Sequence, residues 1–185
     1  MLYLVPIRKQ YNMLMINAIC ATLMTIALPR AEHACKQVPT IMAASEQYDI
    51  EPTVMVSLIH WESRYRPEAV SQAGACGLTQ VIPKWSNPKK TCKQLKDPKT
   101  SIFAGTKMLS DYLYSSYAKA DYRIALCTYN AGYRCRKGPD RQYSESGMKY
   151  AKRVLKLAAK IKKESNIYLD NANWQEVDSC FENHK

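Results

Sequence analysis

A run of apolar residues at helical spacing ends at a glutamate, and this pattern constrains the fold more than any other. Val54, Met55, Leu58 and Ile59 all precede Glu62 at spacings that share one face of an α-helix. Glu62 therefore lies on the face that points into the protein. A charged carboxylate there costs free energy unless it is paired or protonated. The pattern predicts a partly buried glutamic acid with a raised pKa, which is the property of a general acid.

The residues after Glu62 indicate a turn close to this carboxyl group. Gly74 and Gly77 flank Ala75-Cys76 and allow the backbone to turn sharply and to approach a ligand. Gln80 then offers an amide that suits an N-acetyl or peptide group. The alternative is that Glu62 is a solvated residue at a helix end, as most glutamates are. The combination favours a groove for a polar polymer.

Three blocks of sequence, in a fixed order, carry a family pattern. They are Glu62-Ser63 with Pro67-Glu68-Ala69-Val70-Ser71 and Gly74-Ala75-Cys76-Gly77-Leu78-Thr79-Gln80-Val81-Ile82-Pro83, then Tyr129-Asn130-Ala131-Gly132, then Tyr150 with Val154 and Leu155. The blocks resemble the signature of the soluble lytic transglycosylases, lysozyme-like enzymes that cleave bacterial peptidoglycan. The resemblance covers about residues 40–160. It implies a mainly α, lysozyme-like single domain, a helical bundle with a substrate groove.

The resemblance also implies a one-carboxylate mechanism. In that family one glutamate protonates the leaving sugar and then accepts the proton of the 6-hydroxyl of N-acetylmuramic acid, which closes a 1,6-anhydro ring. Glu62 would be this residue. A hydrolase usually needs a second carboxylate, and Glu68 and Asp97 are the nearby candidates. We interpret Glu68 as surface charge and Asp97 as a helix cap.

Five further residues take substrate-binding roles by position in the family pattern. The resemblance implies that Ser63 and Ser71 shape the groove, that Gln80 contacts the glycan near the cleaved bond, that Tyr129 hydrogen-bonds the catalytic acid, and that Asn130 holds its loop or touches substrate. Tyr129 as an aromatic core residue and Ser63 as an ordinary helix C-terminal residue are the alternatives. The pattern implies no cofactor and no metal.

Three positions depart from the family pattern. Thr79 stands where the family has Met, which predicts a change in packing rather than in chemistry. Ser146-Gly147 replaces a common Glu-Thr pair, and Cys127-Thr128 stands where small or apolar residues are usual.

The positive charge of the chain limits the classes of binding partner that we expect. Lys+Arg number 27 against 16 Asp+Glu, a net charge of +11. Such a surface attracts nucleic acid, anionic membrane or an anionic cell-wall polymer. Because no nucleic-acid motif accompanies the basic residues, we expect no nucleic-acid partner. Peptidoglycan glycan strands fit better, and we expect a monomer.

The amino-terminal segment has the pattern of an export signal. Arg8 and Lys9 precede a mostly apolar run from Met13 to Leu28, which is shorter than the roughly 20 apolar residues of a membrane span. We predict a signal peptide over residues 1–34 and a periplasmic or secreted protein. An uncleaved membrane anchor and a buried first helix of the domain are the alternatives.

Seven cysteines are present, and six of them follow this segment. An even number after a signal peptide favours disulfides in an oxidising compartment. Zinc is the weaker alternative because no Cys-x-x-Cys pair exists and His is scarce. Six cysteines allow about 15 pairings. We predict the pairs Cys76–Cys92, Cys127–Cys135 and Cys35–Cys180.

The rest of the chain predicts further helices and no strand. We expect a helix from Pro39 to about Tyr48, one that begins at Pro52, one after Asp97, one capped by Asp121, and a last one over about residues 146–163. The transglycosylase domain would then span residues 35–164, and residues 165–185 would be a polar tail.

Four functional classes remain distinct on sequence grounds. They are a lytic transglycosylase, a hydrolytic lysozyme of the same fold, a non-catalytic wall-binding module and a basic DNA-binding protein, which is the least favoured. The compact size favours local opening of the wall for secretion, conjugation or pilus machinery over general remodelling. A place in a phage particle is a further alternative.

Overall fold

The computed structural model describes the backbone of residues 7–135 and 143–182, and side chains within residues 11–135 and 143–170. These residues form helices and loops with no strand; only two isolated bridges occur, Val70 with Cys76 and Cys76 with Val81. The helices are α1 (Ile7–Thr25), α2 (Ala31–Tyr48), α3 (Pro52–Ser63), α4 (Cys92–Leu95), α5 (Pro98–Leu113), α6 (Tyr122–Ala131) and α7 (Glu145–Glu182), with short 3-10 turns η1 (Pro83–Trp85) and η2 (Gly132–Cys135). The predicted mainly α fold is confirmed.

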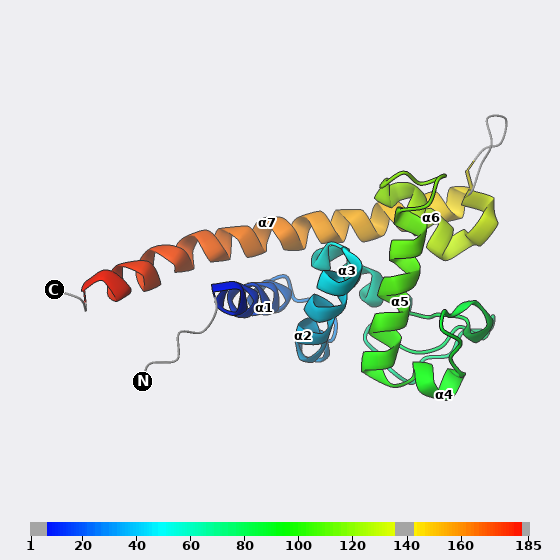
Figure 1. The fold of residues 1–185 in the computed structure, drawn as a ribbon, viewed down its shortest axis with the longest axis horizontal. Helices are drawn as coiled ribbons and strands as arrows, with labels where there is room; N and C mark the ends of the chain where they lie inside the picture. The colour runs from blue at the N-terminus through cyan, green and yellow to red at the C-terminus, as the bar shows by residue number, and fades with distance from the viewer. Residues whose placement is uncertain (1–6, 136–142, 183–185) are drawn as a thin grey trace.

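The helix α3 lies at the centre of the molecule, between α2 and α7 (Figure 1). It is buried on nearly every side from Thr53 to His60. Pro52 occupies its first turn, where a missing N–H leaves no hydrogen bond unmade. The apolar face predicted for this helix is confirmed. Because α3 is enclosed by its neighbours, the position of its last turn, which carries Glu62, is fixed by packing.

The helix α2 is longer than the sequence predicted. It begins at Ala31, so Pro39 lies inside it rather than at its first turn. A proline in a helix interior leaves one backbone carbonyl without its donor. The helix continues nonetheless because Ala34, Val38 and Ile41 are fully buried on both sides of the proline. The predicted domain boundary between residues 34 and 35 falls within this helix.

The amino-terminal helix α1 packs against α2 and α7 (Figure 1). Ile19 and Leu23 are fully buried in the main core. The hydroxyls of Thr22 and Ser165 form a buried hydrogen bond of 3.1 Å between α1 and α7. Among residues 7–135 and 143–182, none of the helices has the combination of length and hydrophobicity that a membrane span requires.

The helix α7 corrects the predicted carboxy-terminal tail. It continues to Glu182 instead of ending near residue 163, so residues 165–182 are helical and only 183–185 lie outside the described residues. The extension was missed because residues after Ser165 lack apolar periodicity. In the described part, the contact of Ser165 with α1 is polar, and a polar contact leaves no apolar pattern.

Two of the three predicted disulfides are confirmed. Cys76–Cys92 and Cys127–Cys135 are bridged, with Cα–Cα distances of 5.5 and 5.6 Å. The predicted Cys35–Cys180 bridge is not formed in the structure, where Cys35 is a free thiol in α2. The side chain of Cys180 lies outside the described residues.

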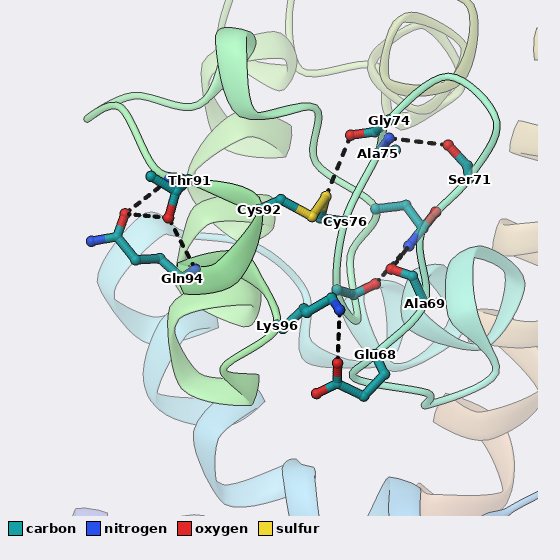
Figure 2. The surroundings of a disulfide bond; sticks show 12 residues. Glu68, Ala69, Ser71, Gly74, Ala75, Cys76, Thr91, Cys92, Gln94 and Lys96 are labelled. Atoms are coloured by element: carbon teal, nitrogen blue, oxygen red, sulfur yellow. Dashed lines mark hydrogen bonds and ion pairs between the residues drawn. A yellow bond between two sulfur atoms is a disulfide. The ribbon is translucent and has the colours of Figure 1, made fainter.

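The Cys76–Cys92 disulfide joins the loop after α3 to α4, as Figure 2 shows. An ion pair of 2.9 Å between Lys96 and Glu68 makes a second link between the same two segments. A capping box starts α4, in which Thr91 and Gln94 bond each other's backbone amides. The loop is thus tied covalently and by charge to the short helix beside it.

The helices α5 and α6 begin where the sequence predicted. The carboxylate of Asp97 accepts from the amide of Thr100, and that of Asp121 accepts from the amide of Arg123. Both caps satisfy amide donors that a helix start leaves unpaired.

Candidate active site

The carboxyl group of Glu62 lies one residue before the end of α3, in apolar surroundings. The residue keeps a little solvent contact, but its carboxyl is largely enclosed. Burial raises the pKa of Glu62 from 4.5 to about 7, while a hydrogen bond from Tyr150 acts in the opposite direction. The Tyr150 hydroxyl lies 2.5 Å from Glu62 Oε1 and comes from α7. The raised pKa predicted from the helical pattern is present.

Tyr150, rather than Tyr129, donates to the acid. The hydroxyl of Tyr129 instead donates to the carbonyl oxygen of Thr79 at 2.7 Å. Burial first, and then the charge of Glu62, raise the pKa of Tyr129 well above its ordinary value, so the ring lies near the acid without bonding it. The prediction that Tyr129 hydrogen-bonds Glu62 is therefore wrong.

The role of Tyr150 was missed although the residue marked the third sequence block. Its spacing to Val154 placed it on the buried face of the last helix, where a tyrosine hydroxyl needs a partner. This need for a hydrogen-bond partner was the sequence signal that could have pointed to a bond between Tyr150 and Glu62. Burial, followed by the charge of Glu62, raises the pKa of Tyr150 well above its ordinary value, so Tyr150 stays a donor at neutral pH.

The amide of Gln80 holds its own loop. Its Nε2 donates to the carbonyl oxygens of Ala69 at 3.1 Å and Gly77 at 2.8 Å. Both amide hydrogens are therefore used, since a primary amide has only two. Gln80 can meet a ligand only through its carbonyl oxygen, as an acceptor. Of the donor and acceptor predicted for Gln80, only the acceptor is therefore free to bind a ligand.

The remaining predicted residues lie in three different settings. Ser63 is buried, and its hydroxyl donates to the carbonyl oxygen of Ile59 at 3.3 Å within α3. Ser71 is exposed, and its hydroxyl accepts from the amide of Ala75 at 3.0 Å. Asn130 is exposed at the end of α6. Ser63 and Ser71 thus shape backbone, and among these three only Asn130 presents a side chain that is not used locally in the described residues.

The departure at Thr79 has a structural reason. Thr79 is fully buried, and a Cβ on Gly105 would lie 2.4 Å from the Cβ of Thr79. Its hydroxyl donates to the carbonyl oxygen of Ser101 at 2.8 Å, and its amide donates to the Ser101 hydroxyl at 3.1 Å. A short branched side chain therefore docks the loop on α5 and places the carbonyl that Tyr129 bonds.

Two of the differences from the family pattern, Cys127 and Gly147, are linked by their packing. A Cβ on Gly147 would lie 2.7 Å from the Cys127 sulfur and 2.9 Å from the Cys135 sulfur. Side chains at this distance do not coexist, so the disulfide between α6 and η2 requires a glycine in the first turns of α7. The glycine at position 147 is therefore needed to make room for the disulfide of Cys127.

No acidic side chain within residues 11–135 and 143–170 lies close enough to shift the pKa of Glu62. The only causes of its pKa shift are burial and Tyr150. Glu68 is an exposed residue paired with Lys96, and Asp97 caps α5, as the sequence interpretation held. The same residues contain no cluster of three or more His, Cys, Asp or Glu side chains. The site offers acid–base chemistry by one carboxyl group.

A mainly helical domain with one enclosed carboxyl group and a tyrosine donor defines a lysozyme-like acid–base site. The family model of the transglycosylase SLT domain matches residues 39–151. The chain belongs to this family.

Similar proteins extend the comparison. The membrane-bound lytic murein transglycosylase C of Pectobacterium atrosepticum is 34% identical over 118 residues, and that of Serratia proteamaculans is 31% identical over 118 residues. Each match covers 55% of this chain but only 32% of the relative. The chain thus spans about a third of the length of these relatives.

Two solved structures share the fold. The lytic transglycosylase Slt of Pseudomonas aeruginosa, in an inactive mutant form, gives a TM-score of 0.61 at 21% identity and covers 69% of this chain and 24% of that one. The 70 kDa soluble lytic transglycosylase of Escherichia coli gives 0.57 at 22% identity and covers 68% of this chain and 24% of that one. The predicted lysozyme-like fold is confirmed by these likenesses.

Proposed function

We propose that this protein is a peptidoglycan lytic transglycosylase that cleaves the β-1,4 bond between N-acetylmuramic acid and N-acetylglucosamine. The observation that carries the proposal is the single enclosed carboxyl group of Glu62, with a pKa of about 7 and no second carboxylate acting on it in the described residues. Such an acid is half protonated near neutral pH, so it can serve as acid and then as base.

The first half of the reaction is proton donation. Protonated Glu62 gives its proton to the glycosidic oxygen, the bond to the leaving N-acetylglucosamine breaks, and positive charge develops on the muramic acid ring. The acetamido group of the substrate assists in the resembled family. The Tyr150 hydroxyl, 2.5 Å from Glu62 Oε1, stabilises the carboxylate that this step creates.

The second half is ring closure without water. The carboxylate of Glu62 accepts the proton of the 6-hydroxyl, whose oxygen bonds to the anomeric carbon and forms 1,6-anhydro-N-acetylmuramic acid. Glu62 ends protonated, as it began, so each turnover balances. A hydrolase of the two-carboxylate type needs a nucleophile or base on the opposite side of the sugar. The two nearby candidates are otherwise engaged, because Glu68 is an exposed partner of Lys96 and Asp97 caps α5.

The other residues of the site position the loop and the glycan. Gln80 presents its carbonyl oxygen to a glycan hydroxyl or amide, while its Nε2 secures the loop through Ala69 and Gly77. Asn130 contacts the glycan from the end of α6. Ser63 and Ser71 support the backbone that frames the bound glycan.

The proposed place of action is the cell envelope. The similar curated proteins are named membrane-bound murein transglycosylases, and two disulfides suit an oxidising compartment. A net charge of +11 suits an anionic wall. We propose export by the amino-terminal segment and local opening of the wall for secretion, conjugation or pilus machinery.

Mass spectrometry of digested sacculi tests the activity. The wild-type protein should release muropeptides with 1,6-anhydro ends, each lighter by one water than the reducing-end product. Glu62→Gln should lower the rate by about 10³-fold or more, because the general acid is lost. Glu68→Gln is the matched control, since this exposed carboxylate only pairs with Lys96, and it should keep the wild-type rate.

Two outcomes would replace the proposal. Reducing ends in place of anhydro ends would make the protein a hydrolytic lysozyme. Binding to sacculi without turnover, unchanged by Glu62→Gln, would make it a non-catalytic wall-binding module.

A further inference from the structure

Two cysteine thiols meet where α1 packs against α2. Cys20 comes from α1 and Cys35 from α2, two helices that pack against each other, and the thiol of Cys35 lies close enough to raise the pKa of Cys20. Both residues are partly buried against the main core, and both are free thiols in the structure. The buried ring of Tyr65, two residues beyond the end of α3, lies close enough to interact with both. The pair is therefore part of the packing that supports the end of the catalytic helix.

The surroundings of the pair do not favour a metal site. Burial, followed by the neighbouring Cys35, raises the pKa of Cys20 to about 12, so Cys20 is a protonated thiol at neutral pH. A metal ion binds the thiolate and would have to displace this proton. No third His, Cys, Asp or Glu side chain joins the pair in a cluster, within residues 11–135 and 143–170. What remains is a pair of thiols in mutual contact.

The two other cysteine pairs of the described residues are oxidised to disulfides. Cys76 with Cys92 and Cys127 with Cys135 are both bridged. Disulfides persist in oxidising compartments and are rare in reducing ones. A chain that carries two of them meets an oxidant, and Cys20 and Cys35 keep enough exposure for that oxidant to reach them.

We propose that Cys20 and Cys35 form a third disulfide, which fastens α1 to α2 and keeps α1 as part of the mature protein. The oxidant is a disulfide, either of a small molecule or of a thiol–disulfide oxidoreductase. One thiolate attacks it and expels the first thiol, and the second thiolate attacks the mixed disulfide and expels the other. Two protein thiols lose two protons and two electrons, and the oxidant leaves as two thiols.

This disulfide goes beyond the proposed function and does not depend on it. It makes the segment around α1 a structural element whose Ile19 and Leu23 complete the core. Removal of residues 1–34 would expose that core and cut α2 after its first turn. It also replaces the Cys35–Cys180 pairing as the partner of Cys35.

Peptide mapping of the full chain tests the disulfide directly. The protein is exported with its native amino terminus, purified without reductant, blocked with a thiol alkylator under denaturing conditions and digested with trypsin. Trypsin should place Cys20 in residues 10–30 and Cys35 in residues 31–36. We expect one species that joins these two peptides and separates into them on reduction.

Every other map would overturn the proposal. Alkylated Cys35 in the unreduced sample would show a free thiol. A link between residues 31–36 and the peptide 164–185 would show that Cys35 pairs with Cys180. A mature chain that begins after Cys20 would show that α1 is removed. Cys180→Ser is the control, because it removes the competing partner and should leave the 10–30 to 31–36 link intact. Loss of wall cleavage would not alter this map, so failure here is distinct from failure of the proposed function.

Thermal unfolding gives a second measurement. A disulfide that closes a loop of about 15 residues should raise the melting temperature by about 6–12 °C in a chain of this length. Cys20→Ser and Cys35→Ser should each lower the melting temperature by that amount, and Cys180→Ser should not. Equal melting temperatures in all four proteins would contradict a formed bridge.

Discussion

The two sides of the site are built in opposite ways. The acid side consists of Glu62, Tyr129 and Tyr150, whose side chains come from three helices and meet in an enclosed space. The loop side, residues 69–81, is held by its own backbone. Its amides and carbonyls pair across the turn, as between Gly77 and Ala69 at 2.9 Å and between Cys76 and Val81 at 3.0 Å.

The difference shows which part of the site lowers the stability of the folded protein: the part that encloses the carboxyl group of Glu62. On the loop side the polar groups we describe are paired, either within the loop or with Ser101 of α5 and Tyr129 of α6. The Cys76–Cys92 disulfide also lowers the entropy of the unfolded chain. On the acid side a carboxyl group is enclosed although its ionised form is disfavoured there. The loop side is therefore rigid support, and the acid side holds a carboxyl group whose ionised form is disfavoured. Each prediction below acts on one side only.

The loop side should be the more sensitive to added volume. A Cβ on Gly77 would lie 1.8 Å from the Leu95 carbonyl oxygen, and φ is +78° there. Gly77→Ala should therefore destabilise the protein by about 3–5 kcal/mol, measured by denaturant unfolding. Gly74→Ala is the matched control, because φ is +76° with no atom within 4 Å, and it should cost about 1 kcal/mol. Equal losses would mean that backbone strain, not the Leu95 contact, governs this turn.

The acid side should gain stability when its charge is removed. The pKa of Glu62 is raised from 4.5 to about 7 in the folded protein, so the folded state binds more protons between these values and loses stability as the pH rises through them. Glu62→Gln should match the wild type near pH 4 and exceed it by up to about 3 kcal/mol above pH 7. Denaturant unfolding at pH 4 and pH 8 checks this. A variant less stable at pH 8 would contradict the enclosed acid.

The two tyrosines should differ in their effect on the acid. The Tyr150 hydroxyl lowers the pKa of Glu62, so Tyr150→Phe should raise this pKa and move the alkaline limb of the pH–rate profile to higher pH. Tyr129→Phe should leave that limb in place, because its hydroxyl bonds Thr79. A shift with Tyr129→Phe alone would restore the pairing first predicted from the sequence.

Local patterns in the sequence were enough to predict the loop side and the helix α3 that carries Glu62. The apolar face that ends at Glu62, the caps Asp97 and Asp121, and the two disulfides that close short loops all depend on residues close in sequence. Interactions over such distances are fixed by helix spacing and turn chemistry. Each was found where it was expected.

Contacts between distant segments could not be read in this way. The Tyr150–Glu62 bond spans 88 residues and depends on how α7 lies against α3. The extension of α7 was missed because the residues after Ser165 lack apolar periodicity, and the contact of Ser165 with Thr22 of α1 is polar. Cys35 was paired with Cys180 as a bridge between the two ends of the domain, whereas the packing of α1 on α2 places it beside Cys20.

A direct titration of Glu62 tests the central claim most simply. The carboxyl carbons of glutamate are labelled with ¹³C, and the signal that disappears in Glu62→Gln is followed by NMR from pH 4 to pH 9. The account predicts that this carboxyl titrates with a pKa of about 7. A pKa near 4.5 would show a solvated carboxylate, which could not donate a proton at neutral pH, and would contradict the account.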